Sequence, residues 1–433
     1  MLDRQDRGMS WGDEIPQGWK SVPLKTRFTF GKGLSITKED LVDAGHPVIS
    51  YGQIHSKKNT GVSIDHCLFR FVKDSDTNQS AVVYPNDFIF ADTSEDLDGC
   101  GNCVYNDTLD SFFGGYHTII LHSISNTTNK YLAYLFKTDL WRSQIRSCLT
   151  EVKVYSISQK VLKKTAILIP PFEVQKRIVD LLDIKCAEID SILKNTLISI
   201  EEFKALKSSV ITEAITKGVR GNRPMKASNI QWAELLPAEW EPVNPKVLFT
   251  QRKEKAHQGE RQLASSQQYG IIYQDDYMAL TGTKIVTVEK DFDILKHVEA
   301  GDFVISMRSF QGGLEYSENT GSISSAYVML KPNPSKVFNR FYKWLFKSQI
   351  YIDALCSTSN MVRDGQAMRY SNFTQIRLYL VPIDEQQEIA AYLDEKCAAI
   401  DSLIASKDAL IAELEAYKKS LIYEYVTGKK KVI

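Results

Sequence analysis

The chain has 433 residues, and its 53 Lys and Arg balance 53 Asp and Glu, so the formal net charge is zero. With 43% hydrophobic and 24% charged residues the composition is that of a folded globular protein, which excludes a largely disordered chain. The length predicts two to three domains, and the absence of any run of about 18 uncharged apolar residues excludes a membrane-spanning helix. The zero charge argues weakly against a nucleic-acid partner, because such binders usually carry a basic excess.

The sequence start and the cysteines indicate the compartment. Asp3, Arg4, Asp6 and Arg7 lie in the first residues without an apolar segment, so no signal peptide is expected. Seven cysteines is an odd number for a long chain, which favours reduced thiols. We therefore expect a cytoplasmic protein.

In chain order, two regions are predicted to be mixed α/β. In the first, runs of β-branched and aromatic residues predict strands at 47–51, 81–84, 87–91 and 117–121, and apolar spacing of three and four predicts one helix over 130–147. In the second, the same signals predict strands at 301–306 and 326–330 and one helix over 339–355. Glycine, asparagine, proline and serine in 218–228 predict a linker into the second region.

Each of these regions is followed by a copy of one shared segment. Residues 171–191 read PFEVQKRIVDLLDIKCAEIDS, and residues 382–402 read PIDEQQEIAAYLDEKCAAIDS. At a constant offset, Gln175 matches Gln386 and Cys186 matches Cys397, and the match continues beyond the quoted letters. The chain is therefore a tandem duplication in which one segment stayed fixed while the region before it diverged.

Each shared segment is predicted to be a long helix with one apolar stripe, here called the seam. Apolar residues alternate in steps of four and three over about five heptads, which gives roughly 40 residues and about 60 Å per helix. A helix of that length needs a partner, and the other copy is the obvious one. We expect antiparallel packing, because a parallel pair in register would set Lys207 against Lys418. The seam residues are Leu182, Ile189, Leu193, Ile200, Phe203, Val210, Leu393, Ile400, Ile404, Ile411, Leu414 and Leu421.

Catalytic motifs are not apparent. An adenine methyltransferase would show an Asn/Asp-Pro-Pro-Phe/Tyr turn, and the nearest match, residues 169–172, begins with Ile169. No Gly-x4-Gly-Lys-Ser/Thr sequence is present. Asp139 with Glu151 and Lys153 has the residue types of a nuclease, but Asp139 lies in a helical pattern. We therefore expect no catalytic residues.

Two weak metal patterns are outweighed by simpler interpretations. Cys100-x2-Cys103 is half of a zinc pattern that His66 and Cys67 would have to complete in space, and free thiols are favoured instead. The acidic stretch 94–99 resembles the start of a calcium loop, but Tyr105 stands where the bidentate glutamate belongs. No metal site is expected.

The duplicated layout resembles the specificity subunit of type I restriction–modification enzymes. The likeness rests on two copies of Pro-x3-Gln…Ile-x3-Leu-Asp-x-Lys-Cys-Ala-x-Ile-Asp-Ser, each closing a region of recognition-domain size. The second region adds residues 301–309, GDFVISMRS, and Gly321-x-Ile-Ser-x2-Tyr327, while residues 87–94 of the first region match less well. The resemblance covers essentially the full chain.

The resemblance implies an α+β fold: two mixed α/β target-recognition domains separated by two long helices that form an antiparallel coiled coil with pseudo-twofold symmetry. The boundaries would be a first recognition domain at 1–171, a central helical spacer at 172–219, a second recognition domain at 220–381 and a C-terminal spacer at 382–433. Each domain would read one half of a split DNA target, and the spacer would set the gap, about one helical turn or 34 Å. This chain would be a non-catalytic, DNA-binding subunit without a cofactor of its own.

The implied partners are double-stranded DNA, two adenine-N6 methyltransferase subunits that bring S-adenosylmethionine, and motor-nuclease subunits. Base contacts are expected from loops after the matched strands, since arginine reads guanine, glutamine reads adenine and acids accept from cytosine. The candidates are Gln53, His55, Ser56, Lys57, Lys58, Asn59, Asp92, Ser94, Glu95, Lys153 and Tyr155 in the first region, and Met307, Arg308, Ser309, Gln311, Arg363, Asp364, Gln366 and Arg369 in the second.

Two other functions remain open from the sequence. One is a stand-alone two-lobed DNA methyltransferase or nuclease, against which the absent nucleotide loop and Ile169 count. The other is a scaffold that uses its coiled coil for assembly alone. Because no segment of the chain is strongly basic, we expect the isolated protein to bind DNA weakly, with partners supplying much of the grip on phosphate.

Overall fold

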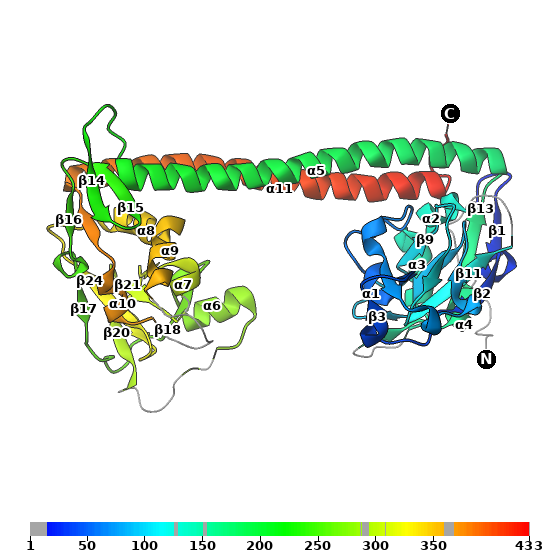
Figure 1. The fold of residues 1–433 in the computed structure, drawn as a ribbon, viewed down its shortest axis with the longest axis horizontal. Helices are drawn as coiled ribbons and strands as arrows, with labels where there is room; N and C mark the ends of the chain where they lie inside the picture. Colours follow the sequence, from blue (N-terminus) through cyan, green and yellow to red (C-terminus); the bar gives the residue numbers. More distant parts are fainter. Residues whose placement is uncertain are drawn as a thin grey trace. The chain divides into compact units, whose positions relative to one another are not determined.

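The computed structural model describes residues 15–124, 129–149, 154–285, 287, 294–307, 309–358 and 368–432. Its chain divides into two compact units (Figure 1). The first unit holds residues 1–195 and 410–433, and the second holds residues 196–409. The division falls inside the two longest helices, α5 (Phe172–Lys217) and α11 (Ile383–Val426), so each helix contributes to both units.

The first unit is built on two sheets. One is antiparallel with the order β2-β11-β7-β9, and the other has the order β3-β5-β4-β10-β6. The pairs β1–β13 and β12–β8 complete its strands. The strands are β1 Lys20–Pro23, β2 Phe28–Lys32, β3 Leu41–Val42, β4 His46–Ile49, β5 Arg70–Val72, β6 Val82–Val83, β7 Phe88–Ala91, β8 Thr93–Ser94, β9 Cys103–Tyr105, β10 Phe112–Gly114, β11 Thr118–Ser123, β12 Tyr155–Ser156 and β13 Ala166–Ile169.

Aromatic side chains join the β2-β11-β7-β9 sheet to the helices that cover it. Phe88 and Phe90 of β7 lie with their ring centroids 5.0 Å and 5.4 Å from that of Phe136. Phe136 in turn lies 4.2 Å from Trp141. All four side chains are fully buried, so this core fixes α2 and α3 on one face of the sheet. The short helices of this unit are α1 Tyr51–Ile54, α2 Lys130–Phe136, α3 Asp139–Arg146 and α4 Gln159–Lys164.

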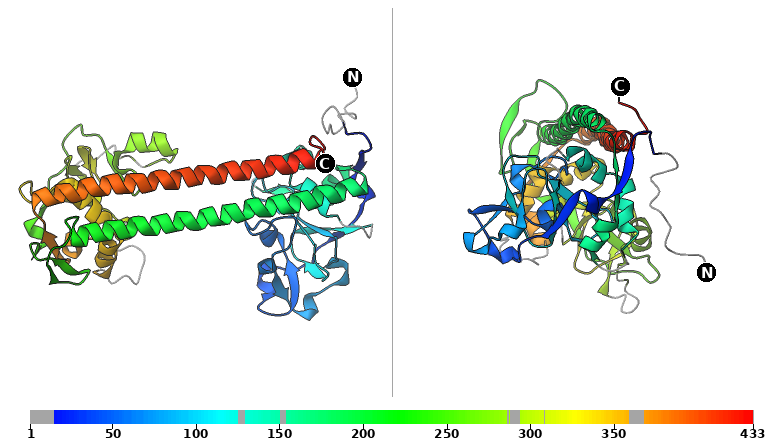
Figure 2. Two further views of the ribbon diagram at one scale, coloured as in Figure 1. Left: turned by 90° about the horizontal axis from the view of Figure 1, so that it is seen from above. Right: turned by 90° about the vertical axis from the view of Figure 1, so that its right-hand side faces the viewer.

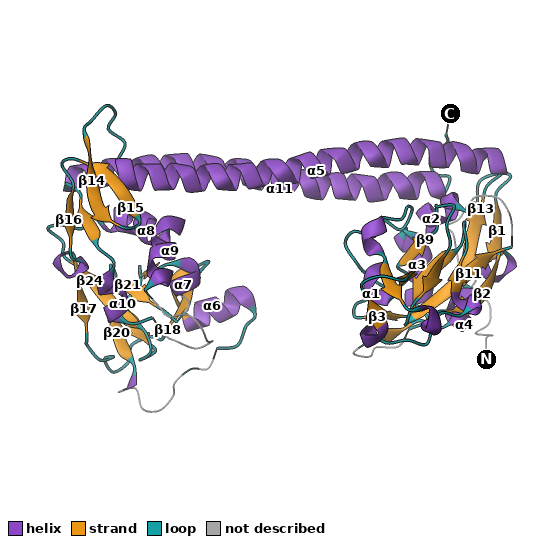
Figure 3. Cartoon of the chain, viewed as in Figure 1, coloured by secondary structure: helices purple, strands orange, loops and turns teal. Residues whose placement is uncertain are grey.

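The second unit repeats the sheet-and-helix plan with different strands (Figure 3). Its main sheet has the order β17-β24-β21-β22. The strands are β14 Met225–Ile230, β15 Ala233–Pro237, β16 Glu241–Val243, β17 Phe249–Arg252, β18 Leu263–Ser266, β19 Gly270–Tyr273, β20 Lys296–Val298, β21 Phe303–Ile305, β22 Glu315–Tyr316, β23 Gly321–Ile323, β24 Val328–Pro332 and β25 Leu378–Leu380. Its short helices are α6 Gln274–Thr281, α7 Ser309–Gly312, α8 Asn339–Lys347, α9 Gln349–Ser357 and α10 Tyr370–Gln375.

A two-stranded antiparallel ribbon leads into each long helix. In the first unit β1 pairs with β13, which ends just before α5. In the second unit β16 pairs with β25, which ends just before α11. The same connection thus occurs at the same place in both copies of the duplicated sequence.

Within each unit, α5 and α11 lie side by side and run in opposite directions (Figure 2). In the first unit Asp190 pairs with Lys418, with an oxygen–nitrogen distance of 2.5 Å. In the second unit Lys207 pairs with Asp401 at 2.7 Å, and Lys407 lies 5.6 Å from the Phe203 ring centroid. The aspartate of each Ile-Asp-Ser motif therefore neutralises the lysine that interrupts the seam of the other copy, which an antiparallel arrangement allows and a parallel one does not.

The predicted seam residues are all removed from solvent in part or in full. Leu182, Ile189, Ile200, Leu393, Ile400 and Leu421 are buried. The other six are half-buried: Leu193, Phe203, Val210, Ile404, Ile411 and Leu414.

An aspartate in each shared segment anchors the neighbouring short helix. Asp183 of α5 accepts hydrogen bonds from Lys130 and Tyr134 of α2, both at 2.7 Å. At the matching place in the second copy, Asp394 of α11 accepts from Trp344 of α8 at 2.8 Å and from Arg340. The duplicated carboxylate holds a recognition-sized domain in both units, although the donors differ.

A backbone carbonyl near the end of each long helix is bonded in the same manner. Tyr131 donates to the carbonyl oxygen of Val426 at 2.7 Å. Tyr379 donates to the carbonyl oxygen of Ile215, which holds the matching place in the other helix. Carbonyls in the last turn of a helix have no intrahelical partner, so these tyrosines satisfy buried groups that would otherwise be unpaired.

The predicted single helices over 130–147 and 339–355 were wrong, because each is two helices. Thr138 has extended backbone angles, and its side chain accepts from the Trp141 amide, so it caps a new helix. Ser348 is also extended, and its hydroxyl donates to the Leu345 carbonyl oxygen at 2.6 Å. Each break turns the second helix back onto the sheet core.

Two other boundaries needed correction. Residues 225–228 belong to β14 of an antiparallel hairpin, so the linker predicted over 218–228 is shorter than expected. The strand predicted over 47–51 ends at Ile49, because Ser50 caps α1 and Tyr51 begins it. No helix in the described part of the chain is both long and apolar enough to cross a membrane.

Candidate DNA interface

In the first unit, the loop of residues 53–59 is held together mainly by its own polar side chains. The Gln53 side-chain oxygen accepts from the Ser50 amide at 3.1 Å as part of the α1 cap. The Asn59 side chain donates to the carbonyl oxygens of Ile54 at 2.7 Å and Cys103 at 2.9 Å. Gln53 and Asn59 therefore shape the loop, which leaves Lys57 and Lys58 as its exposed side chains.

His55 connects this loop to the next predicted one. Its Nε2 lies 2.8 Å from the Thr93 carbonyl oxygen, and its Nδ1 lies 3.1 Å from the Asn102 side-chain nitrogen. Between the loops is a hollow of about 470 Å³ lined by Tyr51, Gly52, His55, Ser94, Glu95, Asp96, Asp98, Gly99 and Asn102. The structure thus brings two loops, predicted separately from the sequence, to one place.

Tyr155 and Asp92 lie at the same edge. Tyr155 is opposite Ser94 in the β12–β8 pair. Asp92 accepts from the Thr93 hydroxyl at 2.8 Å and contacts Nδ1 of His117 at 3.2 Å. Lys153 and Arg308, like Arg363, Asp364 and Gln366, lie outside the described residues.

Three aromatic residues beside this edge escaped the sequence reasoning. The ring of Tyr51 lies 5.6 Å from that of Tyr116 and 5.5 Å from that of His117. His117 has a φ of 54°, a conformation uncommon outside glycine. The pair Gly114-Gly115, at the end of β10 and before β11, was the signal that could have marked this turn.

In the second unit, the predicted residues divide into buried and exposed ones. Ser309 is buried and its hydroxyl accepts from the Ser306 amide at 2.8 Å, so it is committed to the start of α7. Met307 is exposed just before α7, Gln311 is exposed within α7, and Arg369 is exposed just before α10. Met307, Gln311 and Arg369 are the predicted side chains whose surface faces solvent.

The end of α9 joins these two stretches. The Cys356 sulfur lies 2.9 Å from the Phe310 carbonyl oxygen of α7. The Asn372 side chain of α10 donates to the Thr358 carbonyl oxygen at 3.0 Å. The hairpin β18–β19 also approaches, because a Cβ on Gly312 would come within 2.9 Å of Gln267. Glycine at 312 permits this close approach.

The cysteine pair of the first unit is buried. Burial raises the pKa of Cys103 to about 12, and burial is also the main cause that raises the pKa of Cys100. Burial therefore favours the neutral thiol at both positions.

Outside the seam, both long helices expose large apolar side chains. In the first unit these are Phe172, Ile184, Ile192, Leu410 and Tyr417. In the second unit they are Leu197, Ile198, Leu206, Tyr392 and Leu403. Isolated exposed leucines are ordinary, but repeated ones along a helix face are typical of a surface that binds another protein.

Comparison with known families gives a match over part of the chain. Residues 16–202 match the family described as the type I restriction modification DNA specificity domain. The chain therefore carries such a domain in its first unit and the start of α5, and the resemblance expected from the sequence is confirmed.

The likeness to curated relatives extends over almost the whole chain. A putative type I restriction enzyme MjaX specificity subunit of Methanocaldococcus jannaschii is 24% identical over 97% of this chain and 95% of the relative. The type I restriction enzyme StySPI specificity subunit of Salmonella potsdam is 20% identical over 96% of this chain and 90% of the relative.

Solved structures share the fold. A chain from a type I restriction–modification system, solved to explain complex assembly and conformational transition, has a TM-score of 0.69 at 16% identity and covers 96% of this chain and 99% of its own length. The HsdS subunit from Thermoanaerobacter tengcongensis has a TM-score of 0.54 at 15% identity, with the same coverage. The mixed α+β fold with long helices is thus that of type I specificity subunits.

Proposed function

We propose that the chain is the non-catalytic DNA-recognition subunit of a type I restriction–modification complex and that each unit reads one half of a bipartite target. The observation that carries this proposal is the duplicated anchor. Asp183 and Asp394 hold α2 and α8 in the same manner, beneath domains whose loops have different sequences. A split target with two different halves requires two different recognition regions, each attached to a copy of the same helical segment.

The proposed DNA contacts are the exposed polar side chains at the loops described above. In the first unit, Lys57 and Lys58 are exposed on the loop whose His55 lines the hollow. In the second unit, Gln311 and Arg369 offer an amide and a guanidinium, which pair with adenine and guanine edges in the major groove. With a net charge of zero, the chain alone should bind DNA weakly.

We further propose that the two long helices form an antiparallel coiled coil that sets the gap between half-sites. Their exposed apolar side chains, such as Ile184 and Ile198, would be the docking surface for adenine-N6 methyltransferase subunits, two per chain. Those subunits would bring S-adenosylmethionine and flip the target adenine out of the duplex. We also propose that motor-nuclease subunits join this complex and that the complex is cytoplasmic.

The test is a methylation assay with labelled S-adenosylmethionine and genomic DNA. The chain alone should transfer no methyl group, whereas the chain with its methyltransferase subunits should methylate adenines in one split sequence, identified by sequencing. Methyl transfer or DNA cleavage by the purified chain alone would instead favour a stand-alone methyltransferase or nuclease.

Variants in one unit test the division of labour. The double variant Lys57→Ala, Lys58→Ala should change which bases are accepted in one half-site of the methylated target. Arg369→Ala should change which bases are accepted in the other half-site. Ile184→Ser with Ile192→Ser should weaken methyltransferase binding without shifting the melting temperature, because both side chains are exposed. If mutating one unit changes the base preference in both half-sites, the proposal is contradicted.

A further inference from the structure

A group of histidine and glutamate side chains gathers at one place in the second unit. The stretch after β17 runs beside β20: the Ala256 amide donates to the Leu295 carbonyl oxygen and the His297 amide donates to that of Glu254, both at 3.1 Å. This backbone pairing sets Glu254 and His257 against His297, which is distant in sequence. None of the loops proposed above to read DNA includes these residues.

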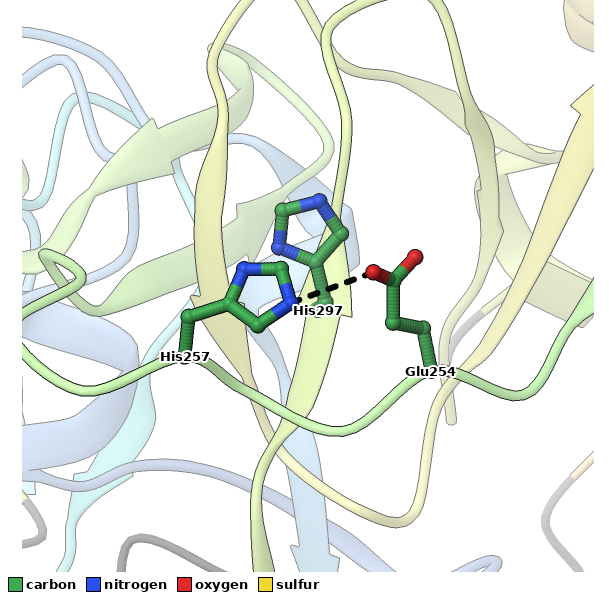
Figure 4. A group of neighbouring side chains, drawn as sticks. All are labelled: Glu254, His257 and His297. Atoms are coloured by element: carbon green, nitrogen blue, oxygen red, sulfur yellow. Dashed lines mark hydrogen bonds and ion pairs between the residues drawn. The ribbon is translucent and has the colours of Figure 1, made fainter.

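The side chains converge (Figure 4). Glu254, His257 and His297 each place one ligand-type atom within 4.8 Å of the others. His257 Nε2 lies 3.1 Å from Glu254 Oε1. The two imidazole centroids are 4.5 Å apart. Two imidazoles and a carboxylate this close together are ligand types that a single divalent cation can share.

Glu260 binds both imidazoles through a single oxygen. Its Oε1 lies 2.6 Å from Nδ1 of His297 and 2.9 Å from Nδ1 of His257. Its Oε2 is buried and has no hydrogen-bond partner among the described residues. A buried carboxylate oxygen normally has a donor or a cation beside it. A cation bound here would satisfy this oxygen.

The surrounding charges also leave room for a cation. Arg252 pairs with Asp302 at 2.6 Å and with Glu254 at 3.0 Å. Glu260 and Glu299 contact the imidazoles instead. Four carboxylates thus surround one guanidinium and two imidazoles, and a divalent cation bound to the imidazole nitrogens would replace the positive charge of protons lost from them to solvent.

The ligand types select the metal. Two imidazole nitrogens with carboxylate oxygens suit Zn²⁺, whereas Mg²⁺ and Ca²⁺ take oxygen ligands. Zinc bonds of about 2.0–2.1 Å require the ligand atoms to be roughly 3.3 Å apart. His257 and Glu254 are about half exposed, with side-chain exposures of 55% and 43%, so they can move inward toward His297, which is 4% exposed.

One neighbour already has the position of a supporting residue. If His297 binds metal through Nδ1, its Nε2 is left to donate to Glu299 Oε2, 3.1 Å away. Glu299 is fixed in turn by the Thr320 hydroxyl, which donates to Oε1 at 3.2 Å. A carboxylate behind the ligand histidine is the usual arrangement at zinc sites, because it orients the ring and sets its tautomer.

We propose that Glu254, His257 and His297, with Glu260, form a Zn²⁺ site that fastens the 253–262 stretch to β20. The ion would serve the fold of the second unit and take no part in chemistry on DNA. The sequence did not reveal this site because its histidines are separated by strands and loops without a compact motif.

The test is a titration of the full chain, freed of metal by a chelator, with Co²⁺ followed by displacement with Zn²⁺. Wild type should bind one ion with the visible absorption of tetrahedral Co²⁺, and His257→Ala should weaken binding by more than about 100-fold. Glu299→Gln should weaken it by 10–100-fold, as expected for a supporting carboxylate. His257 is exposed, so its variant should stay folded, as circular dichroism would verify.

The control is His46→Ala, which removes an exposed histidine that contacts Asp74 in the first unit. It should bind Co²⁺ like wild type. Binding through the seven cysteines would appear equally in all variants and would show sulfur-to-metal charge-transfer bands. Failure of wild type to bind Co²⁺, or unchanged affinity in His257→Ala, would overturn the proposal.

Discussion

Replacing Glu385 by glutamine tests a buried ion pair at the start of α11. Glu385 is fully buried, and its Oε1 lies 2.5 Å from Nη1 of Arg223, whose side chain is 9% exposed. The Trp240 indole donates to the other Glu385 oxygen at 2.9 Å, and the Arg223 guanidinium lies 5.1 Å from a Trp240 ring centroid. Glu385→Gln leaves the arginine charge buried without its main partner.

The expected loss follows from that uncompensated charge. Removing one partner of a buried ion pair costs about 3–5 kcal/mol. Glu239 lies 3.7 Å from the same guanidinium nitrogen, so the lower end of the range, about 3 kcal/mol, applies here. For a unit of this size that corresponds to a fall in melting temperature of roughly 6–12 °C.

Urea unfolding followed by tryptophan fluorescence measures this loss. The matched control is Glu395→Gln, on the same helix but with a side chain that is 79% exposed. If the two variants have the same free energy of unfolding within about 0.5 kcal/mol, the reasoning is refuted. A second arm replaces both partners, as Arg223→Met with Glu385→Val, and should recover most of the stability, because apolar residues often substitute well for a buried pair.

The first unit provides the natural precedent for that double variant. The repeat position matching Glu385 is Val174, which packs against the apolar core cluster of the first unit. The two copies thus solve the same packing problem, one with a charge pair and one with hydrocarbon. In the second unit Gly218 ends α5 with a φ of 73°, and a side chain there would collide with Arg223 and Glu385.

Three further outcomes are expected. Asp183→Ala should lower the unfolding free energy of the first unit by about 1–3 kcal/mol in urea unfolding, because Lys130 and Tyr134 lose a charged acceptor; an unchanged midpoint would exclude the anchor. Lys58→Gln should reduce the slope of log K against log salt for DNA binding by the assembled complex by about 0.9, the value for one phosphate contact; an unchanged slope would remove this lysine from the interface. Burial, with nearby Lys418 and Arg142, lowers the pKa of Lys137 to about 8. The folded state therefore loses this proton at a lower pH than the unfolded state, and the free energy of unfolding should rise between about pH 8 and 10. In Lys137→Met that rise should be smaller, and the same pH dependence in variant and wild type would contradict the lowered pKa.

The sequence revealed the repeat and the seam because both depend on local periodicity. Every predicted seam residue is buried or half-buried, since a heptad pattern places its members on one helix face whatever the partner. The breaks at Thr138 and Ser348 were missed, because apolar spacing continues through them and the extended angles come from tertiary packing. The start of the β14–β15 hairpin was taken for a linker, because its glycines and proline dominate the local signal.

The candidate interface was predicted only at the level of loops. The sequence placed Gln53 and Asn59 among the base readers, but whether an amide faces solvent or a backbone carbonyl depends on how the chain folds around it. Tyr116 and His117 were missed because they belong to a turn between strands. The Glu254, His257 and His297 group was missed because it forms only when a loop and a strand pair.

The pairing of Asp190 with Lys418 and of Lys207 with Asp401 has a consequence for how such a chain could arise. Each copy carries both an acid and a base, placed so that an antiparallel twin satisfies both at once. A surface of this kind is self-complementary, like the contact in a symmetric dimer. A chain consisting of one half would therefore be able to associate with itself, and joining two such halves in one chain would leave each recognition region free to diverge.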